Sequence, residues 1–541
     1  MSSVNFVNEK AENLDRDSAL EMNCTAAGSL QSVLRSNLGP KGTEKMLVGG
    51  AGQVKITKDG NVLLHEMTII HPTAQMIARA STAQDDTVGD GSSSNVLLIG
   101  ELLNQCLRYV KEGIHVSQLV DGVEVAKKKA IAFLEECKVK PEKIDREFLL
   151  NVARTSLSTK LPKKLADQMT EIVTDAVLTI KKGDEIDLHM IEIMHQKEKM
   201  CKDSKLVNGL VLDHGGRHPA MPKRLENCYI LNCNVSLEYE NTEVHSKLIY
   251  SSAEQREKLI ASEHKHTDEL CMKIINLKRE LCDSEEGKKA NKHFVVINQK
   301  GIDPLSLDLL AKEGILGLRR AKRRNAERLI LACGGNAVNS FDDLSKNDLG
   351  EADVVYEEAL DEEKYTFIEG VKNKQSCTIL IRASTGYEIA QIKDAVHDGL
   401  RAVKNVFDDQ SVIPGAGAFE IACSEILKDF AKTKEVEGKQ YYGVNAFADA
   451  LLIIPKAISE NSGVDPQESI INCGKAYREN KKLMGIDLED NGKPINPLDH
   501  GILDNYCVKK SFLNIGPVLA QQFLMVDEVI RAGKHAGKGD E

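Results

Sequence analysis

Tryptophan is missing from this sequence of 541 residues, and aromatic residues make up only 4 per cent of it. Proteins that bind bases or sugars often stack them on aromatic side chains, so this composition does not favour either ligand. The formal net charge is −11, which provides no overall basic surface for nucleic acid. We therefore expect no nucleic-acid partner, and any basic surface must be local.

Long apolar runs are missing as well. No stretch approaches the roughly 20 consecutive apolar residues that a membrane-spanning helix needs. Residues 1–10 contain neither the basic segment nor the apolar segment of a secretory signal. We therefore expect no membrane partner and a cytoplasmic location.

The cysteines lack the spacing that would give them a special role. There are thirteen, with no Cys-x-x-Cys pair and no histidine pattern of the kind that zinc requires. An odd number at irregular spacing also argues against a disulfide framework. We predict buried, reduced thiols, which agrees with a reducing compartment.

The chain is too long for one hydrophobic core, so we expect several domains. Apolar residues recur at helical spacing towards both ends, in segments 15–37, 95–110, 443–459 and 518–530. The middle instead contains short β-rich runs, at 229–231 and 294–297, and we place a domain boundary near Gly215-Gly216. Helix-rich ends around a mixed middle predict a discontinuous domain built from both termini.

Two further segments have a distinctive pattern. Residues 54–57 alternate apolar and polar side chains beside turn residues, which predicts one arm of a β-hairpin. Residues 253–281 are dense in glutamate, lysine and histidine. This segment is predicted to be an exposed helical excursion, because it is too hydrophilic for a core.

Four glycine-containing loops stand beside expected helix or strand ends, at 38–42, 57–60, 89–93 and 414–417. Glycine lets the backbone approach an anion closely, and a helix N-terminus adds unpaired donors. In the third loop Asp90 is suited to hold magnesium, and Ser92 and Ser93 are candidate N-caps. Each loop alone is more often a simple turn. The chain has no Gly-x-x-x-x-Gly-Lys-Ser/Thr motif, so any nucleotide site is not a P-loop.

Asp398 interrupts an amphipathic helical pattern. It lies opposite the apolar stripe made by Ile389, Ile392, Val396, Leu400, Val403 and Phe407. This aspartate is therefore free to face solvent or a site, and the pattern alone favours a solvated side chain.

The four loops resemble, in sequence, order and spacing, those of the group II chaperonins. They read Leu-Gly-Pro-Lys-Gly, Thr-Lys-Asp-Gly, Gly-Asp-Gly-Ser-Ser and Pro-Gly-Ala-Gly. The similarity extends over residues 8–533, nearly the whole chain. Within that family, finer stretches at 45–48, 59–66, 212–215, 296–304, 318–325 and 504–510 resemble the zeta type of eukaryotic cytosolic chaperonin subunit.

The resemblance implies the multi-domain chaperonin fold. A mainly α equatorial domain would comprise 1–145 and 407–541, and an α/β intermediate domain 146–214 and 372–406. An α+β apical domain would comprise 215–371, with a helical lid protrusion at 246–280. The implied function is that of an ATP-hydrolysing subunit of a hetero-oligomeric double ring. Its partners would be paralogous subunits, co-chaperones and non-native polypeptides such as actin and tubulin.

The resemblance also implies a site for ATP and Mg²⁺. Asp90 would bind the metal, and Asp59 and Asp398 would orient and deprotonate the attacking water. Lys160 would sense the γ-phosphate, and Asp504 would contact the ribose. The full nucleotide-binding set is Leu38, Gly39, Pro40, Gly60, Gly89, Asp90, Gly91, Ser92, Ser93, Ser94, Lys160, Gly415 and Asp504.

Several positions depart from the family pattern. Ser92-Ser93 replace two threonines but keep the hydroxyl groups, and Val116 replaces a proline. Gln410 replaces a glycine ahead of the fourth loop, and residues 383–385 lack the glycine usual in a hinge. These last two changes leave open a purely architectural ring subunit with little turnover. A small-molecule ATPase or kinase is the other alternative, but no nucleophile or Gly-x-Ser-x-Gly motif supports it.

A basic run lies in the middle of the chain, at Arg319, Arg320, Lys322, Arg323, Arg324 and Arg328. We predict that it wraps much of one helix. It is either an ordinary solvated face or a patch for acidic clients or a partner chaperone.

Overall fold

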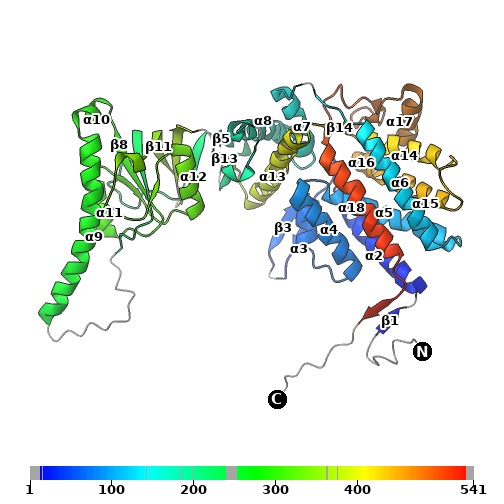
Figure 1. The fold of residues 1–541 in the computed structure, drawn as a ribbon, viewed down its shortest axis with the longest axis horizontal. Helices are drawn as coiled ribbons and strands as arrows, with labels where there is room; N and C mark the ends of the chain where they lie inside the picture. The colour runs from blue at the N-terminus through cyan, green and yellow to red at the C-terminus, as the bar shows by residue number, and fades with distance from the viewer. Residues whose placement is uncertain are drawn as a thin grey trace, which may run out of the picture. The chain divides into compact units, whose positions relative to one another are not determined.

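The computed structural model describes residues 12–14, 16–50, 52–141, 143–183, 185–197, 199–238, 253–360, 363–373 and 376–531. The chain forms two compact units, and Figure 1 traces both. The first unit comprises residues 1–174 and 385–541, and the second unit comprises 175–384. The first unit is therefore built from both ends of the chain.

Helix α5 (Ser92–Lys111) is the centre of the first unit. Its residues Leu97, Leu98, Ile99, Leu102 and Leu103 are fully buried, because a helix that is apolar on most sides has to be covered on most sides. The helices that pack against it include α2 (Arg16–Arg35), α4 (Pro72–Val88), α15 (Gln440–Leu451), α16 (Ile453–Ser462) and α18 (Tyr506–Leu524).

The other helices of the first unit surround this centre. They are α3 (Gly60–Glu66), α6 (Val116–Glu136), α7 (Arg146–Ser158), α13 (Gly386–Asp409), α14 (Ala418–Phe430) and α17 (Pro466–Asn480). Helix α8 (Lys163–Ile180) contains the residues at which the first unit gives way to the second.

Short antiparallel strand pairs complete the first unit. Strand β2 (Lys45–Val48) pairs with β3 (Val54–Thr57), which confirms the predicted hairpin. Strand β14 (Val412–Pro414) pairs with β17 (Leu503–Asn505), and β15 (Gly485–Ile486) with β16 (Pro494–Ile495). Strand β1 (Glu12–Leu14) pairs with β18 (Val529–Arg531), so the two ends of the described chain meet (Figure 1).

The predicted helices at 15–37 and 95–110 are confirmed as α2 and α5. Segment 443–459 is helical but divides into α15 and α16 at Leu452. The prediction of a helix to residue 530 is wrong, because α18 ends at Leu524. Residues 529–531 are instead extended, since their backbone pairs with strand β1 from the other end of the chain.

The second unit contains a mixed sheet in the order β6-β12-β11-β7-β8-β9, with β10 (Ala337–Val338) paired to β7. The strands β7 (Arg224–Cys233), β8 (His293–Asn298) and β9 (Leu316–Leu318) are parallel. The strands β6 (Gly209–Leu212), β11 (Gly350–Leu360) and β12 (Glu363–Val371) are antiparallel to their neighbours. The predicted strands at 229–231 and 294–297 are confirmed as parallel partners. The sheet begins with β6, ahead of Gly215.

A smaller sheet of the second unit has the order β4-β13-β5. It consists of β4 (Ile191–Gln196), β13 (Cys377–Arg382) and β5 (Lys205–Val207). The remaining helices of this unit are α9 (Ala253–Cys282), α10 (Glu285–Lys289), α11 (Pro304–Lys312) and α12 (Arg323–Cys333).

The predicted excursion at 253–281 is confirmed as a helix, α9, but it is not polar throughout. Its C-terminal half contributes Cys271, Ile274, Ile275, Leu277 and Cys282 to the apolar core of the second unit. The prediction that this segment is too hydrophilic for a core is therefore wrong for that half. Residues 246–252 of the predicted lid protrusion lie outside the described residues.

The basic run does not wrap one helix, because only Arg323, Arg324 and Arg328 belong to α12. Arg328 is 2 per cent exposed, and its guanidinium donates to Ser376 Oγ at 3.0 Å and to the Cys377 carbonyl at 2.8 Å.

Most of the other charges in the run are paired within the second unit. Lys322 contacts Asp213 at 2.6 Å, and Arg324 contacts Glu192 at 3.2 Å. Carboxylates close by in the fold therefore neutralise much of this run, and a role in binding partners stays a prediction.

No disulfide joins the thirteen cysteines, all of which lie in the described part of the chain, and ten of them are buried. Burial raises the pKa of the Cys24 thiol to about 12, so this side chain stays protonated and unreactive. The prediction of buried, reduced thiols is confirmed for most of them.

Helices α6 and α15 approach each other closely at two glycines. A Cβ atom on Gly122 would lie 2.3 Å from the Gln440 carbonyl oxygen and 2.9 Å from the Gly443 Cα. Because backbone atoms cannot move aside, we expect Gly122→Ala to lower the free energy of unfolding by about 1–3 kcal/mol. The measurement is the unfolding midpoint of the full chain in urea.

The matched control for this substitution is Gly386→Ala. Gly386 begins α13 and has no atom within 4 Å of an added Cβ. Alanine there is expected to leave the midpoint unchanged or to raise it. Equal midpoints for the two variants would show that α6 and α15 do not meet as described.

Candidate nucleotide-binding site

A pocket of about 600 Å³ lies in the first unit and is lined by most of the predicted nucleotide-binding residues. These are Leu38, Gly39, Pro40, Gly60, Asp90, Gly91, Ser92, Ser93, Ser94, Lys160 and Asp504, together with the predicted catalytic Asp59. Gly89, Asp398 and Gly415 do not line it. Gly415 lies directly behind the wall, since a Cβ there would be 3.0 Å from Asp504 Oδ1.

The turn between α4 and α5 has an unusual backbone. Gly89 ends α4 and Gly91 precedes α5, both in the left-handed region, with φ of 84° and 85°. The prediction that Ser92 and Ser93 cap α5 is wrong, because Gly91 occupies the N-cap position and Ser92 is already helical. The hydroxyls are therefore not used as caps. The first turn of α5 leaves backbone N–H donors unpaired beside the pocket, which suits an anion.

Gly60 allows α3 and α5 to meet at the pocket. A Cβ atom at this position would lie 2.2 Å from Ser93 Oγ, so no other residue fits without a shift. The preceding residue, Asp59, is the N-cap of α3, and its Oδ2 accepts a hydrogen bond from the Val62 N–H at 3.2 Å. The close approach therefore places the Asp59 carboxylate next to the turn that precedes α5.

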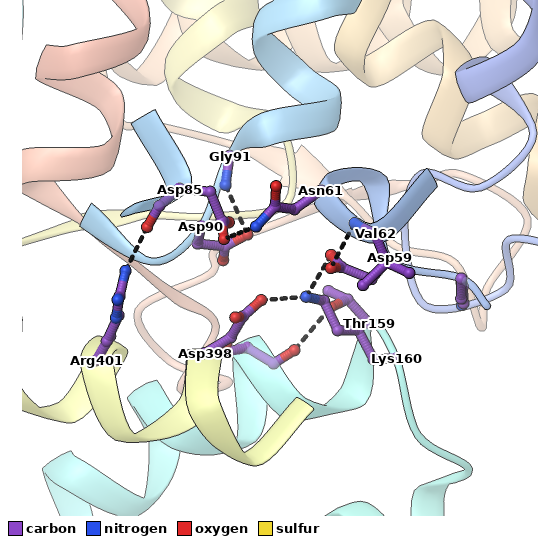
Figure 2. A network of polar contacts seen from close by, with 12 residues as sticks. Asp59, Asn61, Val62, Asp85, Asp90, Gly91, Thr159, Lys160, Asp398 and Arg401 are labelled. Carbon is purple, nitrogen blue, oxygen red and sulfur yellow. Dashed lines mark hydrogen bonds and ion pairs between the residues drawn. The ribbon is translucent and has the colours of Figure 1, made fainter. Parts of the chain in front are cut away.

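Lys160 lies between the two predicted catalytic carboxylates (Figure 2). Its Nζ is 2.8 Å from Asp59 Oδ1 and also forms an ion pair with Asp398 Oδ2. The Lys160 side chain is 13 per cent exposed and the two aspartates 10 per cent each. Three elements far apart in the sequence thus form one nearly buried cluster.

The preference of the sequence pattern for a solvated Asp398 is wrong. The residue is 7 per cent exposed. Helix α13 contacts α7, and it also contacts α4, β3 and β17, so parts of the first unit cover both its apolar stripe and the face opposite. A helical pattern in the sequence cannot show that the polar face of a helix is buried against polar residues of other elements.

Burial and charge act in opposite directions on this cluster. Burial raises the pKa of Asp398 well above its usual value, and the Asp59 carboxylate adds to this effect against the opposing Lys160 charge. Burial also acts to raise the pKa of Asp59, but the charge and hydrogen bond of Lys160 outweigh it and lower that pKa. Asp398 is therefore the carboxylate better able to accept a proton, and Asp59 stays ionised.

Further acidic groups surround the cluster. Burial and the nearby Asp59 raise the pKa of Asp85 to about 6, and Asp85 Oδ2 accepts a hydrogen bond from Asn61 Nδ2 at 2.6 Å. Asp90 is half-buried, and its Oδ1 accepts from the Gly91 N–H at 2.7 Å. Burial raises its pKa as well.

The residues present fit a magnesium ion brought in with a nucleotide. Within the described ranges no three acidic, histidine or cysteine side chains form a complete metal site. Mg²⁺ usually takes one or two carboxylates and completes its shell with phosphate oxygens and water, so Asp90 alone suffices as protein ligand. The nearby Asn61 Oδ1 is buried and has no hydrogen-bond partner in the structure.

Sequence reasoning missed an ion triad at the pocket wall, where Asp504 and Lys509 line the pocket and Glu420 is buried beneath them. Lys509 Nζ is 2.5 Å from Glu420 Oε1 and 3.1 Å from Asp504 Oδ2. Burial acts to lower the pKa of Lys509, but Glu420 and Asp504 outweigh it and raise that pKa above its usual value. The signal in the sequence was a charged residue inside each of two apolar helices, α14 and α18.

Gln410 adopts a conformation that suits the glycine found there in the family. It ends α13 with φ of 49°, and its N–H donates to the Val406 carbonyl. A left-handed non-glycine residue costs about 1–2 kcal/mol. Thr385 is the N-cap of the same helix, and its Oγ1 accepts a hydrogen bond from the Glu388 N–H at 3.3 Å. Both departures from the family pattern are therefore accommodated at the ends of α13.

The fold and the pocket agree with the resemblance to chaperonin subunits. The model of the TCP-1/cpn60 chaperonin family matches residues 30–534. T-complex protein 1 subunit zeta-2 of Homo sapiens is 54 per cent identical over 534 residues, covering 98 per cent of this chain and 99 per cent of that protein. The mouse protein of the same name is 53 per cent identical over the same coverage.

The chain therefore belongs to the TCP-1/cpn60 chaperonin family, and the resemblance to zeta-type subunits is confirmed. Its fold is the multi-domain chaperonin fold, and the family in general is nucleotide-dependent. None of the helices in the described part of the chain combines the length and the apolar character needed to cross a membrane.

Lys509→Met is expected to lower the free energy of unfolding by about 3–5 kcal/mol, because it leaves the Glu420 carboxylate buried without a partner. The double variant K509M/E420Q should recover part of this loss, since it removes both charges. Urea unfolding of the full chain measures each value.

The control for this prediction is Lys493→Met, which removes one partner of an exposed pair with Asp490. Such pairs contribute about 0–1 kcal/mol, so this variant should unfold close to the unsubstituted protein. Equal urea midpoints for K509M and K493M would contradict the importance of the ion triad for stability.

Proposed function

We propose that this chain is an ATP-hydrolysing, magnesium-dependent subunit of a hetero-oligomeric double-ring chaperonin in the cytoplasm. The observation that carries the proposal is the position of Lys160 between two nearly buried aspartates beside a pocket with helix N-terminal donors. A site that only bound nucleotide would not require two carboxylates to be buried against one cation, because that burial is costly.

The residues of the chain divide the chemistry between them. The first turn of α5 holds phosphate oxygens, and Asp504 accepts a hydrogen bond from a sugar hydroxyl. Asp90 would hold a magnesium ion, which would supply positive charge against the phosphates. Asp59 orients the attacking water, and Asp398 takes its proton, for which the raised pKa suits it.

Lys160 links nucleotide binding to this step. In the structure its charge is shared between Asp59 and Asp398. A γ-phosphate is a stronger anionic partner for the lysine than a carboxylate, so its arrival draws the ammonium group away and leaves Asp398 free to act as the base. This exchange makes Lys160 the sensor of the γ-phosphate.

The wider role follows from the family. The names of the relatives describe a subunit of a T-complex protein, and we propose that this chain likewise assembles with paralogous subunits. The equatorial domain (1–145, 407–541), intermediate domain (146–214, 372–406) and apical domain (215–371) are proposed divisions. Hydrolysis would close the ring around non-native polypeptides such as actin and tubulin, with co-chaperones as further partners.

Asp398→Ala is expected to slow hydrolysis at this subunit by about 10²–10⁴-fold, the usual contribution of a general base, and to leave nucleotide binding intact. The assembled complex, isolated through a tag on this chain, is mixed with 8-azido-ATP labelled at the α or the γ position and irradiated at intervals. After denaturation, α-label on the tagged chain reports bound nucleotide, and loss of γ-label relative to α-label reports hydrolysis.

The control for this assay is Asp408→Ala, which removes an exposed carboxylate of α13 that the mechanism does not use. Equal loss of γ-label in D398A and the unsubstituted chain would remove Asp398 from the chemistry. If the unsubstituted chain kept its γ-label throughout, the purely architectural subunit would be the correct interpretation.

The assembly is tested by the native mass of the tagged chain taken from its own cells. We expect a double ring that contains several related subunits of similar size, seen by gel filtration and electron microscopy. A monomer would instead support the small-molecule ATPase, because a chaperonin subunit needs ring neighbours to act.

A further inference from the structure

One face of α13 carries three polar residues that point away from its apolar stripe. Asp398, Arg401 and Asn405 are spaced by three and four residues and therefore lie on the same side of the helix. Asp398 reaches the Lys160 cluster, whereas the other two reach the end of α4, and Figure 2 shows Arg401 beside Asp85.

Arg401 and Asn405 bind the last turn of α4 through its carbonyl groups. Arg401 Nη1 donates to the carbonyls of Asp85 and Asp86, the latter at 2.9 Å, and Asn405 Nδ2 donates to the Val88 carbonyl at 2.9 Å. The last carbonyls of a helix carry partial negative charge, and of these the Asp85 carbonyl also accepts a hydrogen bond from the Gly89 N–H at 2.7 Å. A guanidinium group is suited to these carbonyls, because it is charged and presents several donors.

Gly89 makes this contact possible. A Cβ atom there would lie 2.3 Å from Arg401 Cδ and 2.6 Å from Arg401 Cβ. The aliphatic part of the Arg401 side chain therefore packs directly against the backbone of Gly89, one residue before Asp90. Gly89 does not line the pocket, and the absence of a Cβ at this position is what admits the Arg401 side chain.

We infer that Arg401 and Asn405 are positioning residues: they clamp α13 onto the end of α4 and thereby fix Asp398 relative to the Gly89–Gly91 turn. The clamp joins the helix that carries the base to the turn that carries the metal ligand. This inference rests on the proposed function, because Asp398 must act in hydrolysis for its position to matter.

The test uses R401A, N405A and the double variant in the assembled complex with the labelled 8-azido-ATP assay. Loss of γ-label from the tagged chain should slow by about 100-fold in R401A/N405A, since small displacements of a catalytic group have effects of this size. The amount of α-label should stay unchanged. R401K keeps the charge but cannot span two carbonyls as a planar guanidinium does. Its rate of hydrolysis should therefore lie between those of the unsubstituted chain and R401A.

Lys393→Ala is the matched control, because it removes a cation from an exposed position on the same helix. It should hydrolyse at the rate of the unsubstituted chain. Wild-type hydrolysis by R401A/N405A would overturn the inference, and so would parallel loss of α-label and γ turnover, which indicates general damage to the pocket.

Hydrogen exchange of the assembled complex provides a readout that does not depend on turnover. In R401A and in Gly89→Ala, amide exchange should rise in residues 86–91 and 395–406 and stay unchanged in the second unit. Unaltered exchange in both segments would show that no clamp exists, even if the chain hydrolysed no ATP. Should the double variant fail to fold, R401A and G89A still decide the question.

Discussion

The burial of one cation between two carboxylates is the interaction on which the site depends. Lys160 follows α7, Asp59 begins α3 and Asp398 lies within α13, separated from the lysine by 101 and 238 residues. Each of these charges is costly to bury alone, and they are tolerated only while all three are held together. The surrounding elements must therefore be rigid, and helix α5, whose apolar residues are fully buried, provides the core against which they pack.

Close backbone approaches supply much of that rigidity. Gly60 brings the N-termini of α3 and α5 within contact, and Gly89 lets α13 press its Arg401 stem onto the end of α4. In both places a methyl group would collide with a side chain of the facing helix, Ser93 at Gly60 and Arg401 at Gly89. The glycines of the motifs thus serve the packing of helices as much as the binding of an anion, which the motif alone does not reveal.

The same principle explains where sequence reasoning succeeded and where it was wrong. Strong periodicity correctly predicted α2, α5 and the β2–β3 hairpin, because local patterns decide such elements. The prediction that Ser92 and Ser93 cap α5 was wrong, since the left-handed Gly91 takes the N-cap position. The predictions of solvent exposure for the C-terminal half of α9 and for the basic run that includes Arg328 were also wrong in these places. Each packs against partners that lie far away in the sequence.

The sequence by itself determined the family, the loops that contribute to the pocket and the identity of its main acidic and basic residues. Their order and spacing are linear properties, so a resemblance can detect them. Only the tertiary structure decided that Asp398 is buried against Lys160, that Lys509 joins Glu420 to Asp504, and that Gly89 serves Arg401. These contacts depend on which faces of distant helices meet, and a periodic pattern records the face of a helix but not its neighbour.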